Sequence, residues 1–360
     1  MKKYLIKGLD FIFGLILSNV VPAPIQTSFR TEINSILVIR PGGIGDAVLL
    51  LPMLHELALL QPDAKIDVLA ESRNSEVFSW SPHVSATWRY DYPLNLLKLF
   101  RRHYDLIIDT EQYYRLSAVV ARLMNAPRSI GFATNTRSRL FTDSRPYHQE
   151  RFEAEMFLEL LEPLRTGAFE STGPQNEVLV LPQAEFEFRT PYVVLFPGAS
   201  VSTKQWPIER YAEVARYCEE SGFEVVVVGG KADIQMGEII SHALKRCRNL
   251  VGKTNLSESA SIVAGAALMI SGDSGLLHVA QLLNIPTVAL FGPSNPNKWS
   301  KTGAKHIVVS AKTDCAPCSQ FGTTPPCPFH VRCMREITPV EVFDAAMQLL
   351  SATNPCRQKT

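Results

Sequence analysis

Two polar turns hold the side chains that are best placed to do chemistry. The first, 41–46, has the sequence Pro-Gly-Gly-Ile-Gly-Asp and follows the apolar run 35–40. The second, Asp273-Ser274-Gly275, follows the apolar run 267–270. Each turn leads from an expected strand into an expected helix. Free N–H groups and the positive end of the helix dipole suit a phosphate there, although either turn could be an ordinary helix cap.

Asp46 is the first candidate for catalysis. An aspartate at the start of a helix stays ionised, because the helix dipole favours its charge. An ionised carboxylate at the carboxyl end of a strand can act as a general base. Gly43 and Gly45 let another molecule approach the backbone. The glycine spacing departs from the dinucleotide fingerprint, since Val48 stands at the third glycine position, and this disfavours an NAD-dependent oxidoreductase.

Lys204 is the second candidate. It lies in the loop 197–207, between an expected strand at 192–196 and a helix that begins after Pro207. A compact positive charge in such a loop suits a phosphate, whereas a lone lysine is more often a solvated surface residue. Its place beside a second strand-to-helix turn favours the phosphate contact.

A run of arginines follows the strands of the first half. These side chains form a solvated surface or face an anionic acceptor, since guanidinium groups match phosphate and carboxylate. The run contains Arg115, Arg128, Arg137, Arg139 and Arg145.

Four cysteines near the C-terminus have ligand-like spacing. They are Cys315, Cys318, Cys327 and Cys333, in the pattern Cys-x2-Cys-x8-Cys-x5-Cys. A structural zinc, an iron–sulfur cluster, disulfides and free thiols are all compatible with this spacing. We expect thiols or disulfides without a metal.

Alternating strands and helices position these residues. Strands that alternate with helices predict a parallel sheet with helices on both faces, and the pattern occurs once in each half of the chain. The main strands are expected at 35–40, 65–70, 86–90, 105–109, 192–196, 223–228, 267–270 and 287–291. The sequence therefore predicts an α/β protein with two doubly wound, Rossmann-like domains and a cleft between their strand ends.

The domain boundaries follow from composition. We expect an N-terminal segment and linker at 1–30, a first domain at 31–170, a linker at 171–190, a second domain at 191–338, and a C-terminal helix and tail at 339–360 that packs back toward the first domain. The linker is polar and contains glycine and proline.

The N-terminal segment is predicted to be amphipathic. As a helix it places Lys3, Lys7, Asp10, Gly14 and Ser18 on one narrow stripe, and its other face is apolar. The charges inside the apolar run count against a signal peptide and against a membrane-spanning helix. The pattern suits a helix in a membrane interface, and the alternative is a helix packed on the protein's own surface.

Length, charge and cysteine count exclude several classes of protein. The 360 residues suffice for two domains, and a formal net charge of +1 argues against a general nucleic-acid binder. Seven cysteines, an odd number in a long chain, do not suggest a secreted disulfide scaffold. A cytoplasmic protein is the better expectation.

Four sequence blocks, taken in order, resemble those of glycosyltransferase family 9, the bacterial heptosyltransferases. The blocks are 38–46, 197–207, 272–280 and 291–294. The resemblance covers roughly residues 36–350 and implies the GT-B fold of two facing Rossmann-like domains with an inter-domain cleft. It also implies transfer of heptose from ADP-heptose, or of a sugar from a related donor, to lipopolysaccharide core. Transfer would invert the sugar and need no metal or other cofactor.

The resemblance assigns roles to particular residues. Asp46 would be the catalytic base, and Lys204 would offset charge growing on the departing diphosphate. The residues implied for the nucleotide sugar are Ser200, Thr254, Asp273, Ser274, Gly275, Leu276 and His278. Those expected to meet the acceptor are Gly43, Gly45, Arg137 and Arg139. An anionic glycolipid acceptor would place the protein at the cytoplasmic face of the inner membrane, as a peripheral membrane protein.

Two alternatives stay open. A GT-B-fold UDP-sugar epimerase needs further acid/base groups in the cleft, which we cannot place in the sequence. A catalytically inactive nucleotide-sugar-binding homologue is opposed by the presence of both Asp46 and Lys204. No Asp-x-Asp occurs, so the metal-and-diphosphate device of the other large glycosyltransferase fold is missing.

Overall fold

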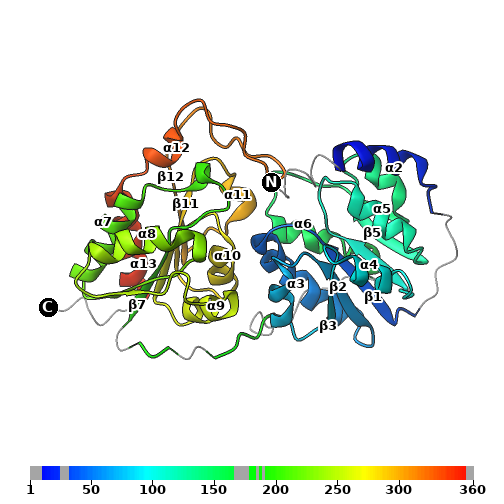
Figure 1. Cartoon of the computed structure of the whole chain (residues 1–360), viewed down its shortest axis with the longest axis horizontal. Helices are drawn as coiled ribbons and strands as arrows, with labels where there is room; N and C mark the ends of the chain where they lie inside the picture. Colours follow the sequence, from blue (N-terminus) through cyan, green and yellow to red (C-terminus); the bar gives the residue numbers. More distant parts are fainter. Residues whose placement is uncertain (1–9, 25–31, 166–177, 184–185, 189–190, 354–360) are drawn as a thin grey trace. The chain divides into compact units, whose positions relative to one another are not determined.

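The computed structural model describes residues 10–24, 32–165, 178–183, 186–188 and 191–353. The chain divides into two compact units, Met1–Val180 and Leu181–Thr360. Each unit is built on its own six-stranded sheet (Figure 1). The division falls inside the stretch 171–190 that we expected to be a linker.

The first unit contains a fully parallel sheet in the order β3-β2-β1-β4-β5-β6. Its strands are β1 (Ser35–Arg40), β2 (Lys65–Ala70), β3 (Val84–Arg89), β4 (Leu106–Asp109), β5 (Arg128–Phe132) and β6 (Asp143–Arg145). The central strands are buried along almost their whole length, which explains their continuous apolar runs.

Helices cover both faces of this sheet. They are η1 (Asp10–Gly14), α2 (Leu15–Val20), α3 (Ile44–Leu60), η2 (Ser75–Trp80), α4 (Pro93–Leu99), α5 (Leu116–Leu123), η3 (Thr136–Leu140), α6 (Glu153–Glu159) and η4 (Glu162–Leu164). The helices α3 and α6 pack on each other. On the other face, Leu99 of α4 and Val119 of α5 share a core cluster with Leu37 and Ile39 of β1.

The second unit repeats the same winding. Its parallel sheet has the order β12-β11-β10-β7-β8-β9. The strands are β7 (Tyr192–Phe196), β8 (Glu224–Val227), β9 (Cys247–Asn249), β10 (Leu268–Gly272), β11 (Thr287–Phe291) and β12 (His306–Ser310). The helices are η6 (Ser202–Lys204), α7 (Ile208–Glu220), η7 (Lys231–Asp233), α8 (Ile234–His242), α9 (Leu256–Ala264), α10 (Gly275–Leu282), α11 (Pro296–Trp299), α12 (Arg332–Arg335) and α13 (Pro339–Thr353).

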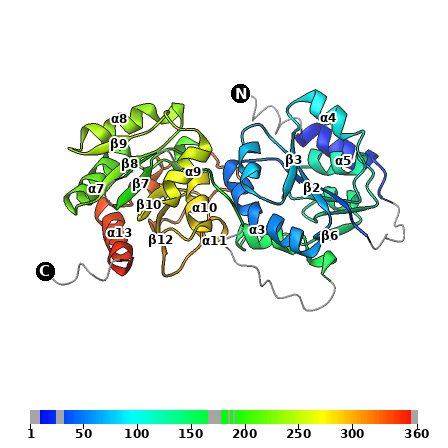
Figure 2. The same ribbon diagram turned by 90° about the horizontal axis from the view of Figure 1, so that it is seen from below.

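The last helix corrects one expectation. We expected the C-terminal helix to pack back toward the first domain. Instead, Val342, Ala346 and Leu349 of α13 are buried in the core of the second unit, together with Val214 of α7 and Ile270 of β10. Figure 2 shows α13 beside α7. The apolar face of α13 is satisfied within its own unit.

Both sheets reverse their winding at one central pair of strands. In the first unit this pair is β1 and β4, and in the second it is β7 and β10. Open α/β sheets bind ligands outside the carboxyl ends of the strands at such a switch point. The turns that carry Asp46 and Lys204 follow β1 and β7, so the topology places both candidates at switch points.

In the described parts of the chain, no helix has both the length and the apolar character that a membrane-spanning helix needs.

Candidate functional site

Asp46 lies in the first turn of α3, which starts directly after β1. Its Oδ2 accepts a hydrogen bond from the N–H of Gly43 at 3.0 Å, and its Oδ1 lies 3.4 Å from Arg40 Nη2. The side chain of Asp46 is 22% exposed. Gly42 has φ +124°, a backbone conformation that favours glycine, and a Cβ there would stand 2.9 Å from Arg40 Nη2. The carboxylate is held on one side and open on the other.

Arg40 joins the two loops of the first switch point. It ends β1 and is buried, and its Nη1 donates to the carbonyl oxygen of Thr110 at 2.7 Å. Its Nη2 lies 3.5 Å from Oε1 of Gln112. Burial lowers the pKa of Arg40, but Asp46 and Glu111 outweigh burial and raise it overall. The guanidinium therefore keeps its charge and fixes the loop after β4 against the turn that carries Asp46.

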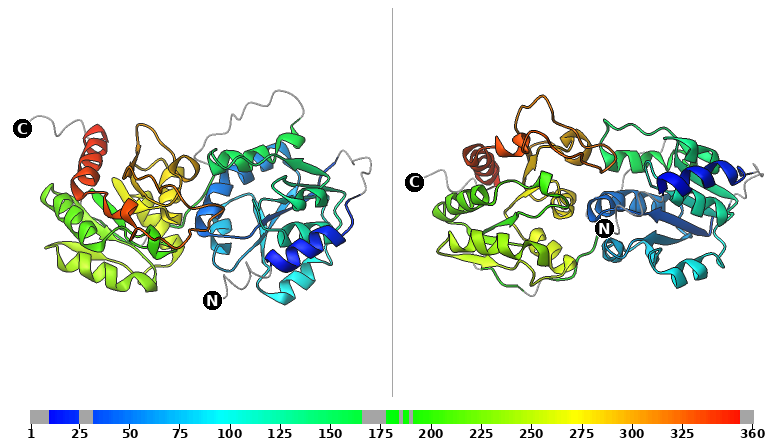
Figure 3. Two further views of the ribbon diagram at one scale, coloured as in Figure 1. Left: turned by 90° about the horizontal axis from the view of Figure 1, so that it is seen from above. Right: turned by 45° about the horizontal axis from the view of Figure 1, so that its top comes forward.

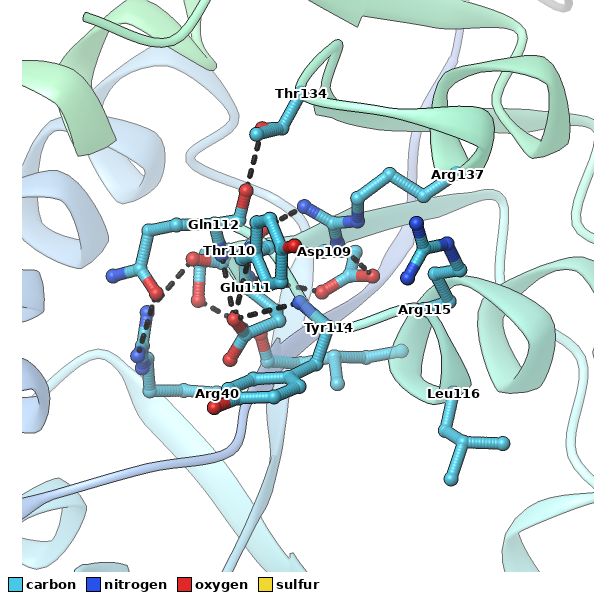
Figure 4. A network of polar contacts seen from close by, with 12 residues as sticks. Arg40, Asp109, Thr110, Glu111, Gln112, Tyr114, Arg115, Leu116, Thr134 and Arg137 are labelled. Atoms are coloured by element: carbon cyan, nitrogen blue, oxygen red, sulfur yellow. Dashed lines mark hydrogen bonds and ion pairs between the residues drawn. The ribbon is translucent and has the colours of Figure 1, made fainter. Parts of the chain in front are cut away.

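A buried polar network follows β4 (Figure 4). Arg137 Nη2 lies 2.6 Å from Asp109 Oδ2, and both side chains are fully buried. Arg137 Nη1 donates to the carbonyl oxygen of Glu111. The Glu111 carboxylate accepts from the N–H groups of Gln112 and Tyr113, both at 3.0 Å. Burial raises the pKa of Glu111, and Arg40 and Arg137 only partly oppose that effect.

The network continues to α6 through Glu153. Gln112 Nε2 donates to Oε1 of Glu153, and the hydroxyl of Tyr147 donates to Oε2 at 2.8 Å. Burial raises the pKa of Tyr147, and Glu153 raises it further. The phenol therefore stays protonated and acts as a donor. This set of contacts rigidifies the elements around Asp46.

The structure corrects our expectation for Arg137. We expected Arg137 and Arg139 to meet an acceptor, but the Arg137 side chain is fully buried and bonded to Asp109 and Glu111. Arg139 is exposed, and its Nη1 donates to the carbonyl oxygens of Ser18, Asn19 and Val21 at the end of α2. Arg139 therefore has a structural role, and its contact with an acceptor stays a prediction, as do those of Gly43 and Gly45.

The second switch point contains a near-buried ion pair. Lys204 ends η6, and its Nζ lies 2.6 Å from Oδ2 of Asp273, which follows β10. Ser294 Oγ donates to the same oxygen at 2.7 Å, and His278 Nε2 lies 3.8 Å from Asp273 Oδ1. Burial raises the pKa of Asp273, but the effect of Lys204 and His278 is larger than that of burial, so the pKa is lowered overall. Asp273 is therefore ionised and positions the ammonium group of Lys204.

The N-terminus of α10 adjoins this ion pair. Ser274 is its N-cap residue, and Ser274 Oγ accepts from the N–H of Leu277 at 3.2 Å. Ser271 Oγ lies 2.8 Å from Ser274 Oγ and orders the cap. The N–H groups of Gly275 and Leu276 stand in the first turn, where the helix supplies no internal acceptor. These donors, the helix dipole and Lys204 together suit a phosphate.

Two further predicted residues lie at the same edge of the second sheet. Ser200 is exposed in the loop after β7. Thr254 follows β9, and its Oγ1 lies 2.8 Å from Ser259 Oγ of α9. Their contacts with a nucleotide sugar stay predictions.

Our reading of the sequence missed the network around Arg40. Its members beyond those we predicted are Arg40, Asp109, Glu111, Gln112 and Glu153. A signal was present, because four polar residues, 109–112, directly follow the buried run 106–108. A buried strand that lies beside β1 and is followed by polar residues indicates the second loop of the switch point.

The cysteine segment forms an irregular loop against the second unit. The thiols of Cys315, Cys318, Cys327 and Cys333 are free. Burial raises the pKa of Cys333, and its three neighbouring thiols raise it further. Across the described ranges, no group of three or more His, Cys, Asp or Glu side chains is arranged to hold a metal ion.

Comparison with known proteins gives a consistent result. The family model described as glycosyltransferase family 9 (heptosyltransferase) matches residues 95–327. Lipopolysaccharide heptosyltransferase 2 of Salmonella typhimurium is 28% identical over 346 residues, which covers 88% of this chain and 98% of that protein. Lipopolysaccharide heptosyltransferase 2 of Escherichia coli is 28% identical over 291 residues, covering 73% of this chain and 84% of that protein.

Solved structures agree with this comparison. The structure of E. coli ADP-heptose lipopolysaccharide heptosyltransferase II matches with a TM-score of 0.70 and 26% identity, over 89% of this chain and 99% of that one. The glycosyltransferase family 9 structure from Veillonella parvula matches with a TM-score of 0.74 and 22% identity, over 91% and 100% of the two chains, and shows the fold alone. The prediction of a GT-B chain with two Rossmann-like domains is confirmed.

Proposed function

Because the chain belongs to glycosyltransferase family 9, we propose that it transfers a heptose from ADP-heptose to the core of lipopolysaccharide. The two relatives named above are lipopolysaccharide heptosyltransferases, and the similar E. coli structure is named for ADP-heptose as well. The observation that supports it in this chain is the second switch point. There, Lys204 is held by Asp273 beside the N-terminus of α10.

The second unit binds the donor in this proposal. A diphosphate brings several negative charges, which the Lys204 ammonium and the N–H groups of Gly275 and Leu276 offset. Charge on the diphosphate grows as the bond to the sugar breaks, so preorganised donors stabilise the transition state more than the bound donor. Asp273 keeps Lys204 in place before the donor arrives.

Asp46 is the base in this proposal. It takes the proton of the acceptor hydroxyl, and that oxygen attacks the anomeric carbon from the face opposite the diphosphate. The bond from the anomeric carbon to the phosphate oxygen breaks, ADP leaves with the bonding electrons, and the configuration of the sugar inverts. The partial exposure of Asp46 and its two holding contacts support this role.

No metal or other cofactor is required in this mechanism. ADP is already a good leaving group, and Lys204 with the first turn of α10 supplies the positive charge that a bound cation would otherwise give. The missing Asp-x-Asp pattern supports the same view.

Replacement of Asp46 by Asn tests the base. We expect heptose transfer to fall by roughly 10²–10⁴-fold, because general-base catalysis contributes about that much. We expect ADP affinity, measured by calorimetry, to stay unchanged. Asp63→Asn is the matched control, since Asp63 is exposed in the loop after α3. Wild-type turnover by the Asp46 variant would remove its role as base.

Thermal-shift titration with ADP, UDP, GDP and CMP tests the donor. The proposal expects ADP to stabilise the protein most, because ligand binding to the folded state raises its apparent stability. A shift with UDP alone would contradict the ADP-sugar assignment. Stabilisation by ADP-heptose without any transfer to lipopolysaccharide core would favour the inactive homologue.

The acceptor sets where the protein works. Lipopolysaccharide core is carried on a lipid anchor, so the proposed reaction takes place at the cytoplasmic membrane surface. We propose peripheral association with that surface.

A further inference from the structure

The described part of the N-terminal polar stripe, which is Asp10, Gly14 and Ser18, faces the protein and not the solvent. Lys3 and Lys7, the other members of the predicted stripe, lie outside the described residues. Asp10 is buried, and its carboxylate accepts from the backbone N–H groups of Arg115 and Leu116 at 2.7–3.1 Å, at the N-terminus of α5. Ser18 is fully buried, with its Oγ 3.0 Å from Thr136 Oγ1. A Cβ on Gly14 would stand 3.2 Å from Arg115 Cβ, so the helix lies close against α5.

Arginine side chains fix the other end of this helix. Arg139 Nη1 donates to the carbonyl oxygens of Ser18, Asn19 and Val21 at 2.6–3.1 Å. Arg122 Nε donates to the carbonyl oxygen of Pro22 at 2.9 Å. Polar contacts at both ends therefore set how η1 and α2 are rotated about their axis.

This rotation turns the apolar side chains outward. Phe13, Ile16 and Val20 are 52%, 54% and 73% exposed, and Leu15 and Leu17 are also exposed. A surface helix of a globular protein normally buries its apolar face and exposes its polar one. The arrangement here is the reverse, and the polar anchors at Asp10 and Ser18 maintain it.

Neighbouring helices extend the exposed apolar surface. The helix α2 contacts α5, and Leu99 of α4 shares a core cluster with Val119 of α5, so all three helices belong to one face of the first sheet (Figure 3). On α4 and the residue after it, Leu94, Leu97 and Phe100 are exposed, with Leu94 at 72%. Leu123 at the end of α5 is also exposed. Exposed apolar side chains gathered on helices of one face mark an interaction site more often than scattered single residues do.

Basic side chains predominate in this layer. The exposed or partly exposed basic side chains of α4, α5 and the turn after α4 are Lys98, Arg101, Arg102, His103 and Arg122, whereas the acidic side chains beside α4 are Asp91 and Asp105. Arg102 also lies 3.5 Å from Asp67. Within the described residues of η1, α2, α4 and α5, the only carboxylate is Asp10, and it is buried. The whole chain is nearly neutral, at +1, so this layer is more basic than the chain as a whole.

We propose that the outer face of α2, α5 and α4 docks on an anionic lipid bilayer. Apolar side chains enter the boundary between headgroups and acyl chains, and the surrounding lysine and arginine side chains meet anionic headgroups. Basic side chains outnumber acidic ones around this face, so anionic headgroups match its charge better than a protein surface of average composition does. This proposal rests on the proposed function in one respect, because it names the surface for the peripheral membrane association proposed above.

Vesicle flotation of the full chain tests this proposal. We expect the wild type to float with vesicles of phosphatidylcholine and phosphatidylglycerol, and to float less with phosphatidylcholine alone or at high salt. Phe13→Ser/Ile16→Ser/Val20→Ser and Leu94→Ser/Leu97→Ser should each weaken binding by at least roughly tenfold, because each removes apolar area that enters the bilayer. These side chains are already exposed, so melting temperature and circular dichroism should stay near those of the wild type.

The matched control is Phe329→Ser/Val340→Ser in the second unit, whose side chains are 54% and 56% exposed. It should float like the wild type. Equal flotation of all variants, or no flotation of the wild type, overturns the proposal. Sedimentation tests the other occupant of this face. If the wild type forms a dimer that the α2 and α4 variants abolish, and does not bind vesicles, the face is an interface between copies of the chain and the proposal is overturned. Flotation involves no turnover, so its failure and a failure of Asp46→Asn are distinguishable.

Discussion

The two units share one sheet topology and differ in how they fill their switch points. In the first, Arg40, Arg137, Asp109 and Glu111 are all buried and bonded to one another or to the backbone. In the second, the main polar contact is the single Lys204–Asp273 pair, with side chains 14% and 11% exposed. One switch point is a closed network, and the other keeps a cation close to the surface.

This difference matches the chemistry that we propose for each unit. A base must stay in one orientation, and the network around Arg40 holds Asp46 in place. A cation that meets a charged donor must be able to share its partner with the ligand, and Lys204 is bonded to Asp273 through one oxygen. A base and a cation that are already in position raise the rate of transfer, because neither has to move as the transition state forms.

The largest expected effect is on the stability of the closed network. Arg137→Met leaves Asp109 buried without its ion-pair partner, and breaking such a pair costs about 3–5 kcal/mol. Native-state hydrogen exchange should show faster opening of β4 and β5, with the strands of the second unit unchanged. The double variant Asp109→Asn/Arg137→Met should recover part of the loss, because it removes the uncompensated charge. Unchanged protection of β4 in the single variant would show that the network is not closed in solution.

A smaller effect on stability is expected at the second switch point, where the main effect is on activity. Lys204→Met should lower turnover by on the order of a hundredfold or more, because it removes the cation nearest to the departing diphosphate. Hydrogen exchange of β7 and β10 should also become faster, but less than that of β4 in the Arg137 variant, because Asp273 loses its cation and is less completely buried than Asp109. The control Lys231→Met removes an exposed lysine that follows β8 at the same sheet edge. Equal activity of the two variants would mean that Lys204 does not meet the donor.

The sequence predicted the fold well because the fold follows from periodicity. The central strands of both sheets and the turns after β1, β7 and β10 could be placed from apolar runs and glycine-rich turns alone. The strands β5, β6, β9 and β12, which lie toward the sheet edges, were not predicted. The C-terminal helix was placed wrongly, since its apolar stripe shows that it packs but not against which core. The same limit applies to the N-terminal helix. Its periodicity predicts an apolar face and a polar stripe but does not show which of the two packs on the protein.

The candidate site was only partly predictable for a related reason. Asp46, Lys204 and Ser274 stand in turns directly after strands, where local sequence is informative. Arg137 is close to Asp109 in space but distant in the chain, and a buried arginine cannot be distinguished from a surface one by residue type. The burial of Arg137 depends on partners at the end of β4, so it can be predicted only when the order of the strands in the sheet is known.

The opposite pKa shifts of two carboxylates give the last and smallest effect. The folded pKa of Asp273 is below its ordinary value of 3.8, because Lys204 and His278 outweigh the effect of burial. Its ionisation therefore stabilises the second unit above about pH 4, and this contribution is lost as pH falls through the folded pKa. The folded pKa of Glu111 is above its ordinary value of 4.5, chiefly through burial. The first unit therefore loses stability as the pH rises from 4.5, the ordinary pKa of a glutamate, through the higher pKa of Glu111 in the folded state.

Hydrogen exchange from about pH 3 to about pH 7, corrected for the intrinsic rate, separates the two effects. Relative to Asp273→Asn, the wild type should gain protection of β7 and β10 as pH rises toward 4. Relative to Glu111→Gln, it should lose protection of β1 and β4 as pH rises above 4.5. Parallel pH profiles in the two units would contradict the contrast, because they would mean that both switch points respond to the same groups. Opposite profiles would show that the two switch points, which share one sheet topology, shift the pKa of a buried carboxylate in opposite directions.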